Sequence, residues 1–490
     1  MTARYLHDIL DGAADFVPSN DAVVHDGVSW TYSQLQSLSQ TYAAWLMQRG
    51  VVRGDRVLVL SRNEKEAVAL IYATSRLGAV YVVLSQDIRS FHLEHILKDS
   101  APALVVCSRE VVRDVSMLAS GKVHAWDELP TIDDYGVCPR IDGASTDLVS
   151  LIYTSGTTAM PKAVASTHAQ VLFASTAISE RLEYRPTDRV FCCLPLSFDY
   201  GLYQVFLSAL AGACLVLGDS SHAGPKLLSA LETEKISVLP AVPGLAQTLS
   251  RLARRAGRMP PRLRLITNTG AALPPAVSGA LRSLSPNLNV VGMYGLTECK
   301  RVSIETPNSD LDRPGSVGLP LTGTEVLILD EDHRALPRGH TGQIAVRGPN
   351  VMAGYWNAPD LTEKKFLRDD LGCTTLLTGD IGRLDEHGRL YFVGRHDDIY
   401  KQDGFRVSSV EIEGAAMHVE GIDEVAVLKP NDVREATLVY TGDLDVDEVR
   451  RELMKRIEGQ KIPKKIYRRG PLPHGVNGKI DKQVLEDQLS

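Results

Sequence analysis

The sequence predicts an α/β protein with a large N-terminal domain of parallel sheets covered by helices, a β-rich subdomain, and a small mobile α+β C-terminal domain. Three observations support this fold class. Short apolar runs alternate with helical patterns through most of the chain, as in parallel sheets covered by helices. Beyond Pro314, turn residues separate short strands. At 490 residues the chain is also too long for a single hydrophobic core.

Local patterns set the expected order of elements. Short β-branched and aliphatic runs between turn residues indicate buried strands, and apolar residues recurring every three or four positions indicate helices. In the large domain these rules predict helices at 64–77 and 92–98 and strands at 56–60, 80–84, 103–107, 189–194, 213–217, 237–240, 263–267 and 289–293. In the β-rich subdomain they predict strands at 325–330, 342–347 and 388–393.

The C-terminal part of the chain has the pattern of a separate domain. Helices are expected at 410–420 and 446–458, and strands at 425–429 and 436–440. The polar link His396-Asp397-Asp398 precedes these elements. We therefore predict a large domain over residues 1–394 and a small domain over residues 395–490, joined by a hinge at this link.

The composition excludes several classes of protein. The formal net charge is −7 and no basic block stands out, so nucleic acid is not an expected partner. The N-terminus lacks the apolar stretch of a signal peptide, and no apolar run reaches the roughly 18 residues of a membrane helix. The seven cysteines include no Cys-x-x-Cys pair. Disulfides and structural zinc are therefore not expected, and a cytoplasmic location fits best.

Residues 153–164 are the most informative segment. They read Tyr-Thr-Ser-Gly-Thr-Thr-Ala-Met-Pro-Lys-Ala-Val and follow a β-branched run. A glycine allows backbone N–H groups to approach phosphate oxygens closely, and hydroxyl and ammonium groups add further donors. The segment differs from the common P-loop, in which Ser or Thr follows Gly-Lys. It predicts a triphosphate site, and a polar surface loop is the alternative interpretation.

Five further motifs follow in a fixed order. They are Tyr294-Gly295-Leu296-Thr297-Glu298, Thr378-Gly379-Asp380, Gly394-Arg395-His396-Asp397, Lys401-Gln402-Asp403-Gly404-Phe405-Arg406 and Asn477-Gly478-Lys479-Ile480-Asp481. With residues 153–164, they resemble the adenylate-forming superfamily of acyl-CoA synthetases, luciferases and nonribosomal peptide synthetase adenylation domains. The resemblance covers nearly the whole chain. It implies activation of a carboxylic acid by ATP and transfer of the acyl group to a phosphopantetheine thiol.

The resemblance also implies roles for individual residues around ATP and Mg²⁺, the expected cofactors. Glu298 is the implied magnesium ligand, in keeping with the preference of this ion for hard oxygen atoms. Lys479 is implied to bridge the substrate carboxylate and the α-phosphate, and it forms the expected catalytic set with Lys162, Glu298 and Thr154. Asp397 aligns with the residue about which the small domain rotates. The implied ATP-binding residues are Thr154, Ser155, Gly156, Thr157, Thr158, Lys162, Gly270, Ala271, Ala272, Tyr294, Gly295, Thr297, Asp380, Arg395 and Lys401.

The substrate end of the site is expected around Asp199. Its motif, Leu194-Pro195-Leu196-Ser197-Phe198-Asp199-Tyr200-Gly201, resembles that of amino-acid-activating domains, in which this aspartate binds the substrate ammonium. A buried carboxylate needs a cationic partner. Arg301 is a rival partner for Asp199, or a ligand for an acidic substrate side chain. The expected substrate-binding residues are Asp199, Tyr200, Tyr203, Thr267, Thr269, Met293, Arg301 and Val302.

Several functions remain open at the level of the sequence. An acid–thiol ligase is favoured, with an amino acid preferred over other carboxylic acids as substrate. The thiol is expected on a carrier protein acting in trans, and free CoA is the alternative acceptor. A luciferase-like oxygenase shares the implied fold, without specific support in this sequence. A non-catalytic nucleotide-binding protein is disfavoured because Lys162, Glu298, Asp380, Arg395 and Lys479 are all present.

Overall fold

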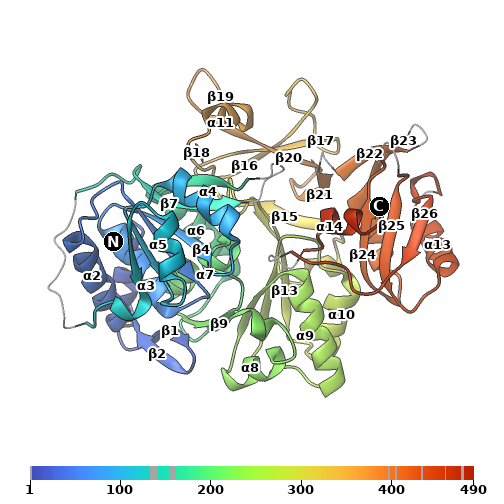
Figure 1. The fold of residues 1–490 in the computed structure, drawn as a ribbon. Coiled ribbons are helices and arrows are strands. Elements are labelled where there is room, and N and C mark those ends of the chain that lie inside the picture. Colours follow the sequence, from blue (N-terminus) through green and yellow to red (C-terminus); the bar gives the residue numbers. More distant parts are fainter. Residues whose placement is uncertain are drawn as a thin grey trace.

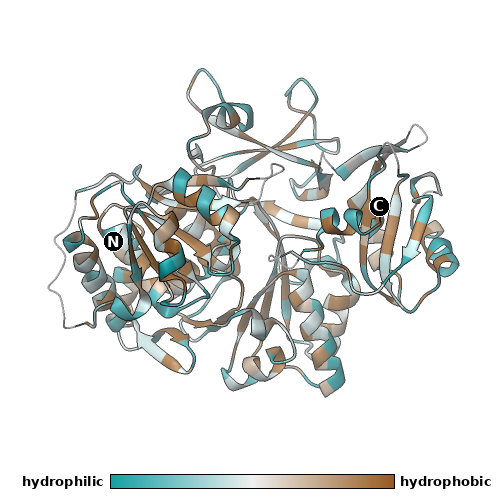
Figure 2. Ribbon diagram, in the orientation of Figure 1, coloured by the Kyte–Doolittle hydropathy of each residue, from teal (hydrophilic) through white to brown (hydrophobic). Residues whose placement is uncertain are grey.

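The chain folds around two large sheets and a smaller C-terminal unit (Figure 1). The computed structural model describes residues 3–132, 142–154, 160–395, 398–402, 405–431, 434–457, 459–475 and 479–489. Brown, hydrophobic segments fill the strands, and teal segments lie on the outer helices (Figure 2). In the described part of the chain, no helix combines the length and apolar character needed to cross a membrane.

The first sheet has seven strands in the order β18-β8-β7-β4-β3-β5-β6. Both of its faces are buried, because Val57 and Val59 belong to one hydrophobic cluster and Leu58 and Leu60 to another. This explains its continuous apolar strands. The strands are β3 (Arg56–Ser61), β4 (Val80–Ser85), β5 (Leu104–Cys107), β6 (Lys122–Ala125), β7 (Leu148–Thr154), β8 (Lys162–Thr167) and β18 (Gly354–Tyr355). The accompanying helices are α2 (Tyr32–Gln48), α3 (Lys65–Arg76), α4 (Ser90–Ser100), α5 (Val112–Leu118), α6 (His168–Leu182) and the 3-10 turn η1 (Trp126–Glu128).

The second sheet has a parallel central part with antiparallel strands at both ends. Strand order is β16-β17-β20-β21-β15-β14-β13-β12-β11-β9-β10-β1-β2, with β19 beside β20. The strands of its parallel part are β1 (Asp21–His25), β9 (Arg189–Cys192), β10 (Cys214–Leu217), β11 (Val238–Ala241), β12 (Leu265–Asn268) and β13 (Asn289–Tyr294). Strand β2 (Val28–Thr31) pairs antiparallel with β1 at one edge. The others are β14 (Ser303–Ile304), β15 (Ser316–Pro320), β16 (Glu325–Leu329), β17 (Thr341–Arg347), β19 (Phe366–Arg368), β20 (Thr374–Leu384) and β21 (Leu390–Arg395). The helices are α1 (His7–Phe16), α7 (Asp199–Ala211), α8 (Leu227–Thr233), α9 (Pro243–Ala256), α10 (Pro275–Leu284), α11 (Pro359–Lys365), η2 (Ser220–Ala223) and η3 (Ser309–Leu311).

The C-terminal unit has its own sheets and its own hydrophobic clusters, and lies to the right in Figure 1. Its elements are β22 (Ile399–Gln402), β23 (Phe405–Ser408), α12 (Ser409–Met417), β24 (Ile422–Leu428), β25 (Thr437–Gly442), α13 (Val446–Met454), η5 (Gly459–Lys461), β26 (Lys465–Arg468) and α14 (Lys482–Asp487). The strand order β24-β25-β26 combines one antiparallel and one parallel pair. Division of the chain between residues 394 and 395 remains a prediction.

The predicted α/β fold class is confirmed, and the structure refines several boundaries. The helix expected at 410–420 ends at Met417, because the chain turns through Gly421, with φ +96°, into β24. The strands expected as a β-rich subdomain join the parallel strands through β14 and β15 into one sheet. That continuity depends on pairing between strands distant in sequence, which local patterns do not encode.

Candidate active site

A cavity of about 1440 Å³ lies where several parallel strands of the second sheet end. Leu194, Val242, Asn268 and Tyr294, at or just after the carboxyl ends of β9, β11, β12 and β13, all line it. The carboxyl edge of a parallel sheet is the usual place for a ligand in α/β folds. The C-terminal unit closes the cavity with residues that include His418 and Lys479.

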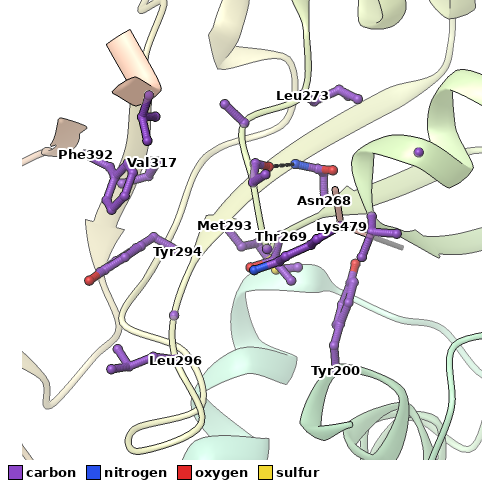
Figure 3. Close-up of a pocket in the computed structure, with 18 of the residues that line it drawn as sticks. Tyr200, Asn268, Thr269, Leu273, Met293, Tyr294, Leu296, Val317, Phe392 and Lys479 are labelled. Atoms are coloured by element: carbon purple, nitrogen blue, oxygen red, sulfur yellow. Dashed lines mark hydrogen bonds between the residues drawn. The ribbon is translucent and has the colours of Figure 1, made fainter. Parts of the chain in front are cut away.

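One wall of the cavity combines an aromatic ring with a buried carboxylate. The Tyr294 hydroxyl donates a hydrogen bond to Asp380 Oδ2, and Arg395 Nε lies 3.7 Å from Asp380 Oδ1. Asp380 and Arg395 are register partners on β20 and β21, so strand pairing brings them together. Burial raises the pKa of the Asp380 carboxyl above its ordinary value. The ring of Phe392 lies 5.7 Å from that of Tyr294 and extends this wall (Figure 3).

The loop after β13 folds tightly and directs Glu298 into the cavity. A Cβ at Gly295 would lie 2.2 Å from the Lys300 carbonyl oxygen, so the turn requires glycine. The Tyr355 hydroxyl donates to Glu298 Oε1, and the Met352 backbone N–H donates to the Glu298 carbonyl oxygen. These bonds fix a carboxylate on the cavity wall. Its hard oxygen atoms suit a Mg²⁺ ion bound mainly through phosphates and waters.

Lys479 enters the cavity from the C-terminal unit (Figure 3). A Cβ added to Gly270 would lie 3.6 Å from Lys479 Cε, so the lysine packs against the loop after β12. Desolvation by the cavity walls lowers the pKa of the Lys479 ammonium, and the charge of Arg395 lowers it further. Gly270, Ala271 and Ala272 all line the same part of the cavity.

The ends of the β7–β8 hairpin supply two more of the expected nucleotide residues. Thr154 and Lys162 are register partners, and both line the cavity. The Thr154 hydroxyl donates to the Lys162 carbonyl oxygen at 3.4 Å. Ser155, Gly156, Thr157, Thr158, Asp397 and the side chain of Lys401 lie outside the described residues.

The opposite end of the cavity is built around the first turn of α7. Asp199 begins this helix and lines the cavity. The hydroxyl of buried Tyr200 donates to the Thr267 carbonyl oxygen at 2.8 Å, and the Arg301 guanidinium lies 5.2 Å from the centre of the Tyr200 ring. Arg301 Nη1 donates to Thr269 Oγ1 at 3.2 Å. No ion pair joins Arg301 to Asp199 among the described residues.

Lys300 and Arg301 are two adjacent buried cations at this end. The two residues are only 1% and 5% exposed, and Lys300 Nζ and Arg301 Nε have no hydrogen-bond partner in the described structure. Lys300 has a left-handed backbone, with φ +59°, and its ammonium lies 5.9 Å from the centre of the Tyr203 ring. Burial lowers the pKa of Lys300 to about 8, against the opposing effect of the Asp199 and Glu298 carboxylates.

The cavity brings together most, but not all, of the predicted site residues. Tyr203, Thr267 and Val302 are buried behind its wall and do not line it. The remaining predicted residues with described side chains line the cavity. Sequence reasoning did not single out several other lining residues: Asn268, Leu273, Gln247, Arg251, Val317, Phe392, His418 and His474. No sequence motif marks these residues, because they come from strands, helices and loops that lie far apart in the chain.

Comparisons with known proteins agree with this geometry. The family model described as AMP-binding enzyme matches residues 10–356. One plipastatin synthase of Bacillus subtilis is 29% identical over 98% of this chain and 19% of its own length. This chain therefore spans about a fifth of that relative. Long-chain-fatty-acid--CoA ligase FadD13 of Mycobacterium tuberculosis is 29% identical, with 94% of each chain covered.

Among solved structures, this chain is similar to VinN. The complex of VinN with L-aspartate has 40% identity and a TM-score of 0.74, covering 80% of this chain and 99% of the other. A complex of VinN with 3-methylaspartate has 38% identity and a TM-score of 0.68, covering 79% and 99%.

Proposed function

We propose that this chain, which belongs to the AMP-binding enzyme family, is an AMP-forming acid–thiol ligase that activates an amino dicarboxylic acid. The observation that carries the proposal is buried Arg301, which lines the Asp199 end of the cavity, with the buried cation Lys300 next to it in the chain. Unsatisfied buried charges are costly. A ligand carboxylate bound at Arg301 would offset the charge of both cations.

We infer the substrate class from the charges around this end. Asp199 would bind the substrate ammonium, and Arg301 a carboxylate that is not activated. Lys300 lies behind the cavity wall and adds positive potential where that carboxylate would sit. Of the two roles open to Arg301, we favour binding of a substrate carboxylate over neutralisation of Asp199, since no ion pair joins these two residues in the described structure. The VinN complexes with L-aspartate and 3-methylaspartate support the same substrate class.

Activation requires the second carboxylate to attack the α-phosphorus of ATP. The new C–O–P linkage forms as the bond to the β-phosphate breaks, and pyrophosphate leaves. Lys479 would neutralise charge on the attacking carboxylate and the α-phosphate, an electrostatic contribution that is usually large. Asp380 would accept hydrogen bonds from the ribose, and Arg395 would reach the ribose or phosphates.

We also assign residues to the adenine ring, the Mg²⁺ ion and the phosphates. Tyr294 and the loop of Gly270, Ala271 and Ala272 would contact adenine, and Gly295 and Thr297 would line the path to the phosphates. Glu298 would hold Mg²⁺, which neutralises phosphate charge when bound. The β- and γ-phosphates are assigned to Thr154, Ser155, Gly156, Thr157, Thr158, Lys162 and Lys401.

In the second step a phosphopantetheine thiol would attack the acyl carbon. The C–S bond forms, the bond from carbon to the AMP oxygen breaks, and AMP leaves. We assign the thiol to a carrier protein acting in trans, with CoA as the alternative. The small domain, residues 395–490, would rotate about Asp397 between the two steps.

ATP–pyrophosphate exchange tests the proposal directly. The acids to compare are L-aspartate, 3-methylaspartate, asparagine, succinate and leucine. We expect exchange with an amino dicarboxylic acid, and at least tenfold less with asparagine or succinate at equal concentration, since each lacks one charged group. Exchange only with monocarboxylic acids would overturn the substrate assignment, and no exchange with any acid would overturn the activity itself.

A further inference from the structure

Positive charge is concentrated in one segment of an otherwise acidic chain. Residues 235–297 contain eight Lys and Arg residues and no Asp or Glu, although the net charge of the chain is −7. This segment includes β11, α9, β12, α10 and β13. Six of its arginines lie close together in sequence, on α9 and the loop that follows.

Four of these arginines form what we call the arginine surface: Arg251, Arg254, Arg255 and Arg262. All four are exposed, and within the described chain none forms an ion pair. Their neighbours in the segment differ, because Arg258 pairs with Glu232 at 2.9 Å and Arg264 and Arg282 pair with aspartates. The positive charges of the arginine surface therefore face solvent and are not neutralised by an ion pair within the described chain.

Helix α9 connects the arginine surface to the cavity. Gly244, Gln247, Thr248 and Arg251 line the cavity and share one face of the helix, because they are three or four positions apart. Arg254 and Arg255 continue this face by one turn. From Gln247 to Arg255 the helix rises about 12 Å. The opposite face packs into a hydrophobic cluster through residues such as Leu245 and Leu249, which fixes the arginines outward.

We propose that the arginine surface docks the acidic face of a carrier protein, whose phosphopantetheine arm enters the cavity along α9. This inference rests on the proposed acid–thiol ligase function. We favour a folded protein over CoA because the cations extend along a helix and its following loop, beyond the cavity rim. Such a field steers an anionic partner and raises its association rate.

The test is a double charge reversal at the two arginines that lie outside the cavity, Arg254→Glu/Arg255→Glu. Purified holo-carrier proteins of differing net charge serve as acceptors, with pantetheine and CoA as small thiols. We expect the variant to lose about tenfold or more in kcat/KM for the most acidic carrier. The loss should shrink as salt is raised. ATP–pyrophosphate exchange and transfer to pantetheine should stay within twofold of the wild type.

A matched control carries the same charge change elsewhere. Arg113 on α5 and Arg368 on β19 are exposed arginines away from the cavity, so Arg113→Glu/Arg368→Glu should load carriers normally. Equal loading by the wild type and the Arg254→Glu/Arg255→Glu variant overturns the docking surface, and so does acylation of CoA in preference to every carrier. Absent exchange in the wild type would instead indicate that the proposed function is wrong.

Discussion

The two ends of the cavity differ in how far their charged residues are compensated by neighbouring residues. At the nucleotide end, the Asp380 carboxylate accepts from Tyr294 and lies near Arg395, whose side chain is 49% exposed. At the substrate end, Lys300 and Arg301 are buried, and each has a nitrogen without a partner in the described structure. The nucleotide end is therefore nearly satisfied by its own residues, whereas the substrate end is completed only by a ligand. We therefore expect the substrate end to determine which acid is bound. We also expect its buried cations to lower the stability of the ligand-free protein.

The largest expected effect of a substitution is at Lys479, on the nucleotide side of the cavity. Lys479→Ala should reduce ATP–pyrophosphate exchange by about 100- to 1,000-fold, since removal of one electrostatic stabiliser has this effect. Thioester formation from preformed aminoacyl adenylate should remain mostly intact. Lys455→Ala is the matched control, because Lys455 is an exposed lysine of the C-terminal unit that pairs with Glu452 one turn away. Exchange at a near-normal rate in Lys479→Ala would remove this lysine from the first step.

At the substrate end, Arg301→Ala should lower kcat/KM for an amino dicarboxylic acid by about 30- to 1,000-fold. The basis is a loss of about 2–4 kcal/mol, which lies within the range for a buried charge pair that loses one partner. KM for ATP should change little, and Arg301→Lys should recover part of the activity. Equal losses for leucine and for aspartate would show that Arg301 supports the fold of the cavity instead of reading a carboxylate.

Asp199→Ala probes the same end through the substrate ammonium. We expect KM for the amino acid to rise about 10- to 100-fold, the range for a lost hydrogen bond to a charged group. KM for the corresponding dicarboxylic acid without the amino group should remain unchanged. Steady-state exchange kinetics with both acids measure this difference. A parallel rise for both acids would contradict an ammonium-binding role.

The smallest effects follow from the titration of Lys300, whose pKa is about 8 in the folded protein. Its ordinary value is higher, so between pH 8 and about 10.5 the unfolded chain binds more protons and stability rises with pH. Substrate affinity should change in the opposite sense, because the ammonium charge is lost above pH 8. KM for the dicarboxylic acid should therefore increase severalfold from pH 7 to pH 9.

Lys300→Met separates these two consequences. At pH 7 it should stabilise the ligand-free protein by up to about 3 kcal/mol, the cost of keeping a lysine protonated at this depressed pKa. The same change should weaken binding of the dicarboxylic acid. Thermal unfolding with and without substrate measures both effects. A less stable variant would mean that Lys300 has compensating contacts in solution, and the contrast between the two ends would disappear.

Much of the fold was accessible from local patterns. The alternation of short apolar strands with helices predicted the α/β class, and the six ordered motifs predicted the family. Both predictions are confirmed. Motif residues such as Tyr294, Asp380 and Lys479 meet at the cavity, while their individual roles remain predictions. Gln247 and Phe392 were not singled out, because they reach the cavity from a helix and a strand without a motif.

The sequence by itself determined the kinds of side chain available and the periodicity of each element, since both depend on near neighbours. Only the tertiary structure decided which charges are buried. The sequence assigned no role to Lys300, and it left Arg301 with two possible partners. In the fold, Lys300 is enclosed beside Tyr203, and Arg301 turns to Thr269 and Tyr200. A charge acquires its energy from its solvation and from all the groups around it, and those groups come from distant segments of the chain.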